Sequence, residues 1–99
     1  MQPYAIKFHA RVHRDLNDIY DYITFEKKST GGRYVLEELV QACMQLRYEP
    51  AAVGHPKMAS NGEMHYMINK WRYHIYYTVD ESTSVVTISK IYHGARRPW

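Results

Sequence analysis

Three side chains with acid–base or charge chemistry alternate along one stretch of the sequence, at Arg72, His74 and Tyr76. Because successive side chains of a β-strand point to opposite faces, these three are predicted to share one face of a sheet. Together with His93 from a later segment, they could supply the cation, the base and the acid that proton transfer at a phosphate requires. The structural alternative is that Arg72 and Tyr76 are solvated sheet residues and that His74 pairs with a neighbouring strand.

The end of the chain, KIYHGARRPW, holds three fixed cations, a histidine, two large aromatic residues and no acid. The guanidiniums of Arg96 and Arg97 can each fork onto a carboxylate or a phosphate, and Trp99 adds a flat apolar anchor. Arginine beside tryptophan is also the usual composition of a binding hot spot. A solvated tail is the alternative. We predict a target-binding end formed by His93, Arg96, Arg97 and Trp99.

Six histidines raise the question of a metal site. His9 and His13 are four residues apart, a spacing that can place two ligands on one helix face. However, His9 is expected to precede the helix, and His65, His74 and His93 fall on three strands with no fixed register. We therefore predict no metal site and no cofactor.

The composition is that of an ordinary globular protein, with 45% hydrophobic and 23% charged residues among 99. This length predicts a single domain over residues 1–99. No apolar run approaches the roughly 20 residues of a membrane span, and the N-terminus lacks the apolar stretch of a signal peptide. The lone cysteine, Cys43, excludes an internal disulfide, is expected to be buried, and suits a reducing cytoplasm, where we expect the protein to act.

Charge is distributed unevenly along the chain. Residues 1–50 carry seven basic and seven acidic side chains, whereas residues 51–99 carry six basic and three acidic ones and so supply the whole net charge of +3. Five of the ten tyrosines lie between Tyr66 and Tyr92. A basic and aromatic C-terminal half indicates a polyanionic or acidic partner, either nucleic acid or an acidic protein segment.

Hydrophobic periodicity predicts a strand over Tyr4–Phe8 and two helices, one from Ala10 to about Lys28 and one from about Arg33 to Tyr48. Turn residues separate the helices, and Pro50, Gly54 and Pro56 are expected to open a loop. The inward-facing helical residues are predicted to be Val12, Leu16, Ile19, Ile23, Leu36, Leu39, Val40 and Cys43. The acidic residues of the first helix are expected to form a solvated side with no site: Asp15, Asp18 and Asp21.

The remaining chain is predicted to be a β-meander, with strands over Glu63–Asn69, Trp71–Val79 and Ser84–His93 and a turn at Asn69-Lys70. The architecture is therefore α+β, in the order β-α-α-β-β-β, with a helical hairpin on one face of a mainly antiparallel sheet. The residues expected to face the helices are Trp71, Tyr73, Ile75, Tyr77 and Val79. The opposite residues are expected on an uncovered, basic and aromatic face: Arg72, His74, Tyr76 and Thr78.

Four segments in this order resemble the ParE/RelE toxin superfamily of bacterial type II toxin–antitoxin systems: DLNDIYDYI (Asp15–Ile23), a helix ending at Leu46–Pro50, YHIYYTVD (Tyr73–Asp80) and IYHGARR (Ile91–Arg97). The resemblance spans nearly the whole chain and implies the same β-α-α-β-β-β fold. The first helix and the ending resemble the ParE branch more closely. One departure is Gly31-Gly32, which stands where relatives carry helix-forming residues.

The resemblance implies a toxin that a cognate antitoxin neutralises. ParE-like members poison DNA gyrase, which is the activity expected here and makes an enzyme the less favoured reading. RelE-like members cleave messenger RNA on the ribosome, and in that alternative the catalytic residues would be Arg72, His74, Tyr76 and His93. His93 is followed by Gly94 rather than by the aromatic residue of the branch it matches. A third alternative is a non-toxic module that only binds its partner.

The antitoxin implied by the resemblance is the product of an adjacent acidic reading frame. It is expected to cover part of the helical hairpin and the basic sheet face, with contacts at Arg72, Tyr76, Arg96 and Arg97. DNA binding in such complexes belongs to the antitoxin, so none is expected of this chain, and no membrane association is expected either.

Overall fold

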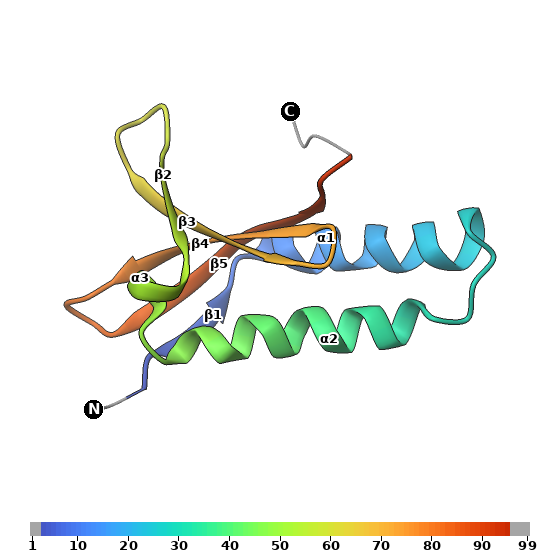
Figure 1. The fold of residues 1–99 in the computed structure, drawn as a ribbon, viewed down its shortest axis with the longest axis horizontal. Coiled ribbons are helices and arrows are strands. Elements are labelled where there is room, and N and C mark those ends of the chain that lie inside the picture. Colours follow the sequence, from blue (N-terminus) through green and yellow to red (C-terminus); the bar gives the residue numbers. More distant parts are fainter. Residues whose placement is uncertain (1–2, 96–99) are drawn as a thin grey trace.

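The computed structural model describes residues 3–95 (Figure 1). The elements in chain order are β1 (Ala5–Phe8), α1 (Ala10–Asp21), the π-helical turn η1 (Tyr22–Glu26), α2 (Gly32–Met44), the 3-10 turn η2 (Gln45–Arg47), α3 (Pro50–Val53), β2 (His55–Met58), β3 (Met64–Lys70), β4 (Tyr73–Asp80) and β5 (Val85–His93). The predicted α+β order of a strand, a helical hairpin and a meander is confirmed.

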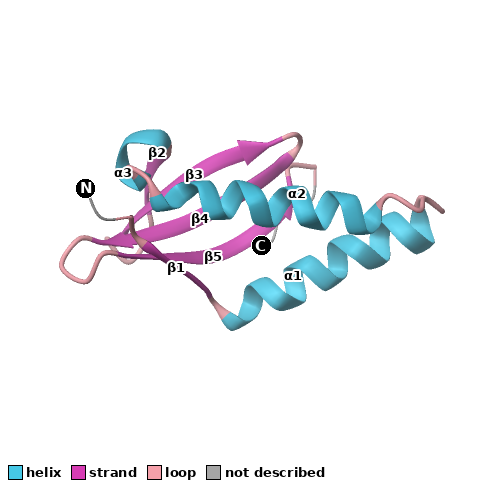
Figure 2. Ribbon diagram, turned by 90° about the horizontal axis from the view of Figure 1, so that it is seen from below, coloured by secondary structure: helices cyan, strands magenta, loops and turns pink. Residues whose placement is uncertain are grey.

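The sheet has five strands in the order β1-β5-β4-β3-β2. β1 runs parallel to β5, and every other neighbouring pair is antiparallel. The parallel pair is possible because the hairpin of α1 and α2 begins the long return from β1 that such pairing needs. The hairpin packs against one face of the sheet (Figure 2). The opposite face carries none of the helices described for residues 3–95, and none of those helices is long and apolar enough to cross a membrane.

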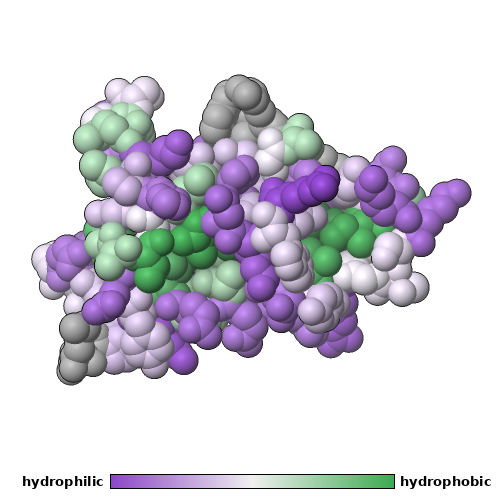
Figure 3. Space-filling view, in the orientation of Figure 1, coloured by the Kyte–Doolittle hydropathy of each residue, from purple (hydrophilic) through white to green (hydrophobic). Residues whose placement is uncertain are grey.

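The core lies between the hairpin and the sheet. Most of the predicted inward residues lie in or against this core, with Val12 and Ile19 buried on α1 and Leu39 and Cys43 buried on α2. Val40 is an exception, because it is only half-buried and is not among the residues packed against the core, whereas Val35 is. Burial raises the pKa of the Cys43 thiol to about 12, which leaves it an unreactive apolar residue. Figure 3 shows hydrophilic side chains over most of one surface, with apolar side chains in two patches, one of them over the hairpin.

The segment after η2 was expected to be a loop, but it forms α3 and the edge strand β2. The buried Tyr77 holds α3 in place, because its hydroxyl donates a 2.6 Å hydrogen bond to the carbonyl oxygen of Pro50. All of β2 is exposed, so it lacks the alternation by which strands are recognised. Pro56 is compatible with an edge strand because only one side of that strand needs backbone donors.

The turn between β3 and β4 also differs from the prediction. It was expected at Asn69-Lys70, but Lys70 pairs with Tyr73, and the two turn residues are Trp71 and Arg72. Trp71 therefore lies outside the core and is half exposed, although its ring is near that of Tyr34 on α2. Arg72 lies in the turn rather than on either face of the strand. The other predicted helix-facing residues of this strand do lie there: Tyr73, Ile75, Tyr77 and Val79.

Candidate functional site

The face of the sheet turned away from the helices carries a stack of side chains from β4 and β5. His74 pairs with Tyr92, and Tyr76 pairs with Lys90, across the two strands. The ring centroids of His74 and Tyr92 are 5.2 Å apart, those of Tyr76 and Tyr92 are 5.7 Å apart, and the two tyrosine hydroxyls lie 3.2 Å from each other. The Lys90 ammonium sits 4.7 Å from the centre of the Tyr76 ring. We name these four residues the open-face stack.

A cavity of about 510 Å³ opens beside this stack. Its lining residues are Arg11, Lys57, Met58, Ala59, His65, Tyr76, Ser89 and Lys90. No acid is among these described lining residues, whereas three of them are fixed cations. Burial, together with the nearby Arg11 guanidinium, lowers the pKa of Lys90. The cavity is therefore suited to an anionic group such as a carboxylate or a phosphate.

A β-bulge at Ser89 shapes this cavity. Tyr77 pairs with Ile88 and Tyr76 pairs with Lys90, so Ser89 is left without an opposite residue, and its hydroxyl donates to the carbonyl oxygen of Tyr76 at 3.1 Å. The bulge brings Ser89 and Lys90, which are consecutive, to the same cavity. In an unbroken strand two consecutive side chains would point to opposite faces.

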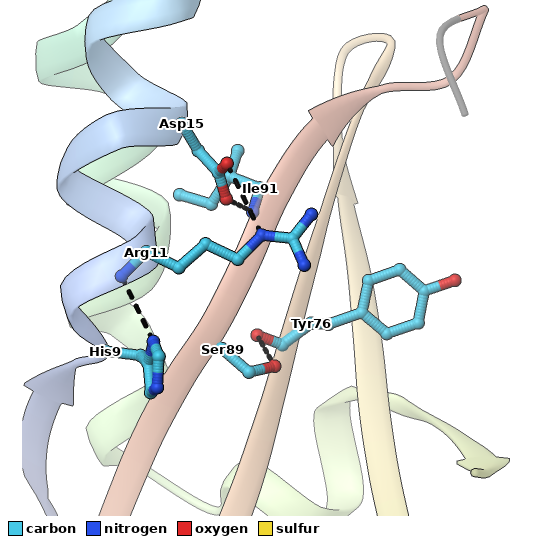
Figure 4. Close-up of polar contacts among 6 residues, drawn as sticks. All are labelled: His9, Arg11, Asp15, Tyr76, Ser89 and Ile91. Atoms are coloured by element: carbon cyan, nitrogen blue, oxygen red, sulfur yellow. Dashed lines mark hydrogen bonds and ion pairs between the residues drawn. The ribbon is translucent and has the colours of Figure 1, made fainter. Parts of the chain in front are cut away.

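Asp15 fixes α1 against the sheet next to the bulge (Figure 4). Its side chain is only 15% exposed, accepts the backbone N–H of Ile91 at 3.0 Å and lies 3.6 Å from the Arg11 Nε atom. Arg11 reaches from α1 across β5 toward Tyr76 (Figure 4). The prediction that Asp15 belongs to a solvated acidic side is therefore wrong, although Asp18 and Asp21 are exposed.

We expect Asp15→Ala to lower the free energy of unfolding by about 1–3 kcal/mol, because it leaves the part-buried Ile91 N–H without its acceptor. Asp15→Asn keeps an oxygen acceptor, so its free energy of unfolding should fall less than that of Asp15→Ala. Urea denaturation measures both changes, with the exposed Asp18→Asn as a control that should stay within about 0.5 kcal/mol of the parent. If Asp15→Ala and Asp18→Asn lower the free energy of unfolding by the same amount, the hydrogen bond from the Ile91 N–H to Asp15 does not stabilise the fold.

The expected grouping of four site residues on one face is wrong for two of them. Tyr73 pairs directly with His93, so both side chains share the helix face, and their rings meet edge to face at 5.3 Å. The bulge at Ser89 is the reason, since one extra residue reverses the facing of every later side chain in β5. Arg72 is separated from His74 and Tyr76 because it lies in the turn. Only His74 and Tyr76 remain together on the open face.

Comparison with known proteins agrees with this fold. A family model described as the ParE toxin of the type II toxin–antitoxin system parDE matches residues 6–98. The chain belongs to the ParE toxin family. No curated protein sequence matches it.

Solved structures of toxin–antitoxin proteins share the fold of this ParE-family chain. The RelBE2 complex of Mycobacterium tuberculosis gives a TM-score of 0.72 at 24% identity over 97% of each chain. The archaeal RelE–RelB complex of Pyrococcus horikoshii gives 0.67 at 18% identity, covering 96% of this chain and 99% of that one. The chromosomal ParDE system of Pseudomonas aeruginosa gives 0.69 at 18% identity, covering 91% and 95%.

The predicted end of this ParE-family toxin lies partly outside the described residues: Arg96, Arg97 and Trp99 belong to the undescribed segment. The described part ends firmly attached to the sheet. The Gly94 N–H donates to the carbonyl oxygen of Arg72 at 2.7 Å, and a Cβ on Gly94 would lie 2.7 Å from the His74 Nε2 atom. Gly94 therefore lies beside the β3–β4 turn and remains hydrogen-bonded to it.

Several residues of this cavity are not predicted from the sequence as part of a functional site: Arg11, Lys57, His65, Ser89 and Lys90. The excess of basic residues in the second half of the chain was a signal for Lys57 and Lys90 alone. Lys57 was missed with β2, while Ser89 and Lys90 depend on the bulge. Among the described residues, no three histidine, cysteine or acidic side chains gather as a metal site, and His9 instead caps α1 by accepting the Arg11 N–H.

Proposed function

We propose that this ParE-family toxin arrests bacterial growth by poisoning DNA gyrase. The observation that carries the proposal is the separation of the predicted acid–base set, with His93 on the helix face and His74 and Tyr76 on the other. A chain that acts by binding a protein target needs no such set in one place. The match to the ParE toxin model over residues 6–98 supports the same choice. Gyrase is cytoplasmic, and so is the proposed site of action.

We also propose a cognate antitoxin whose acidic and apolar segment covers the open face around Tyr76. The cavity beside Tyr76 supports this placement, because Lys57 and Lys90 line it and none of its described lining residues is an acid. Arg11 adds a third cation, although the Asp15 carboxylate lies 3.6 Å from it. Two of the similar structures are named as complexes of a toxin with its antitoxin. Affinity for such a partner should fall with rising salt, because part of the attraction is between exposed charges. The predicted antitoxin contacts at Arg96 and Arg97 remain proposals, and Arg72 lies apart from this face at the turn.

Growth and enzyme assays test the proposal together. Induced expression of the chain alone should arrest bacterial growth, and co-expression of the adjacent acidic reading frame should restore it. Purified toxin should inhibit supercoiling by gyrase and leave ribosome-bound messenger RNA intact. A folded chain without effect on growth would contradict the toxin assignment, and RNA cleavage without an effect on gyrase would contradict the target.

The cavity beside the open-face stack favours one other function, ribosome-dependent cleavage of messenger RNA. His65 or Lys90 would take the proton of a 2′-hydroxyl as its oxygen attacks the adjacent phosphorus, and Lys57 would stabilise the charged phosphorane. The bond to the 5′-oxygen would then break, and the Tyr76 hydroxyl would give its proton to that leaving oxygen.

Separate substitutions distinguish the two targets. If the chain is a nuclease, His65→Ala and Lys90→Ala should each reduce ribosome-dependent cleavage by at least about 100-fold, because acid–base groups contribute on that scale. His74→Ala and Tyr76→Ala should likewise remove nuclease activity. A gyrase poison should retain inhibition of supercoiling in all four variants. Loss of gyrase inhibition in these variants would show that the open face contacts gyrase, contrary to the proposal.

A further inference from the structure

The turn between β3 and β4 places a bulky aromatic residue in an unfavourable backbone conformation. Trp71 has φ of 55°, in the left-handed region that glycine favours. It is the first of two residues in a two-residue hairpin turn, where glycine, asparagine or aspartate is the usual choice. Nevertheless the Trp71 residue is 51% exposed, so burial in the core does not explain its presence. A strained and exposed tryptophan indicates a function at this position.

The surroundings hold the Trp71 ring in a defined place. The ring of Tyr34 from α2, whose residue is 61% exposed, lies 6.1 Å away between centroids. The Lys70 ammonium lies 4.8 Å from the Trp71 ring, and Glu38 of α2 anchors that ammonium at 3.5 Å. The two exposed rings therefore lie side by side, beside an ammonium that Glu38 positions, and together offer an aromatic surface to a partner.

A second cavity, of about 410 Å³, continues this surface toward the end of the hairpin. Its lining residues are Tyr22, Ile23, Lys27, Ser29, Gly31, Val35, Arg72, Tyr73 and His93. The described lining includes the apolar or aromatic side chains of Tyr22, Ile23, Val35 and Tyr73. Its basic members are Lys27, Arg72 and His93, and it contains no aspartate or glutamate. The cavity can therefore take an apolar side chain that is flanked by carboxylates.

We infer that Tyr34, Trp71 and this cavity form a docking surface, here named the turn surface, for an acidic and apolar segment of the target protein. The inference rests on the proposed action on a protein target. Charge complementarity selects an acidic segment, and the paired rings and the apolar cavity select an apolar one. We assign this surface to the target rather than to the antitoxin, because His93, the first residue of the predicted target-binding end, lines the cavity. Gly94, which follows it, is bonded to Arg72 of the same cavity.

The test uses a substitution with opposite expected effects on folding and on binding. Trp71→Gly places in the turn the residue that its backbone favours, so the thermal midpoint should equal that of the parent or exceed it by up to about 4 °C. The same variant should lose growth arrest and bind purified DNA gyrase at least about 30-fold more weakly, as expected for a hot-spot residue. Tyr34→Ala is the second variant and should weaken gyrase binding in the same direction.

Tyr48→Ala is the matched control, because Tyr48 is 55% exposed and also lies beside a cation, with the Arg47 guanidinium 5.2 Å from its ring. It should leave growth arrest and gyrase binding unchanged. Affinity for co-purified antitoxin should change by less than about threefold in Trp71→Gly, a shift within the range of surface substitutions. Immunoblots should show equal amounts of every variant.

Different failures have different meanings. If Trp71→Gly binds gyrase and arrests growth like the parent, the turn surface is wrong while the proposed function stands. If Trp71→Gly loses antitoxin binding but still binds gyrase, the turn surface binds the antitoxin and the inference is wrong. Equal losses in Trp71→Gly and Tyr48→Ala would also overturn it. If the parent neither binds gyrase nor arrests growth, the proposed function fails first and the inference fails with it.

Discussion

Deletion of residues 96–99 is expected to abolish growth arrest while leaving the fold and antitoxin binding largely intact. The last buried core residue among those described is Ile91, and Gly94 still bonds to Arg72 in the shortened chain. The deleted residues include two guanidiniums and a tryptophan, which are the groups predicted to engage the target. Growth curves after induction measure the loss of growth arrest, and the thermal midpoint of the purified chain measures whether the fold is retained.

Two arginine variants refine the same prediction. Arg96→Ala with Arg97→Ala should remove toxicity nearly as completely as the deletion. Arg96→Lys with Arg97→Lys keeps both charges but removes the planar fork, so its residual toxicity reports how much of the binding depends on paired hydrogen bonds. Full growth arrest by the shortened chain would show that the end of this protein is a solvated tail.

Gly54→Ala is expected to be the most destabilising single methyl addition among the described glycines. A Cβ at this position would lie 2.8 Å from the Tyr77 Cζ atom and 3.0 Å from the Tyr66 Cβ atom. Tyr77 cannot withdraw, because it is fully buried and its hydroxyl is bonded to the Pro50 carbonyl. Overpacking of this kind lowers the free energy of unfolding by about 1–3 kcal/mol, and separation of Tyr77 from Pro50 would add about 1 kcal/mol.

Gly31→Ala is the control for the added methyl group, because its φ is −85° and the only atom near the new Cβ is the hydroxyl oxygen of the exposed Ser29 at 3.3 Å, which accepts the Gly31 N–H. It should change stability by less than about 0.5 kcal/mol. In a double-mutant cycle, Tyr77→Phe should recover part of the loss in Gly54→Ala, since the hydroxyl is the atom nearest to the new Cβ. Chemical denaturation of the four proteins gives the coupling, and strictly additive effects would contradict the contact.

The position of His93 on the helix face shows why the candidate site could be predicted only in part. His74 and Tyr76 lie two residues apart in one regular strand, so their shared face followed from local alternation. His93 lies beyond the bulge at Ser89, where β5 carries one residue more than β4 between paired positions. The buried positions Val86, Ile88 and Ile91 change phase at this point, but the pairing with β4 decides which residue is the extra one.

The sequence by itself determined the helical hairpin, the core face of the meander, the family and the basic character of the second half. Each of these depends on periodicity or residue type within one segment, as the buried stripes of Val12, Ile19, Leu39 and Cys43 illustrate. The basic character of residues 51–99 likewise follows from the number of charged residues alone.

Only the tertiary structure decided which polar and charged side chains lie close together. The Asp15 carboxylate meets the Ile91 N–H across 76 positions of the chain, and the Tyr77 hydroxyl meets the Pro50 carbonyl across 27. Such contacts fix α3, the edge strand β2 and the cavity between Arg11 and Lys57, and they depend on which strands lie side by side. Trp71 is exposed for the same reason, because the pairing of Lys70 with Tyr73 places it in the turn. Strand register is a property of the assembled sheet, and a one-residue change in it moves a side chain to the opposite face.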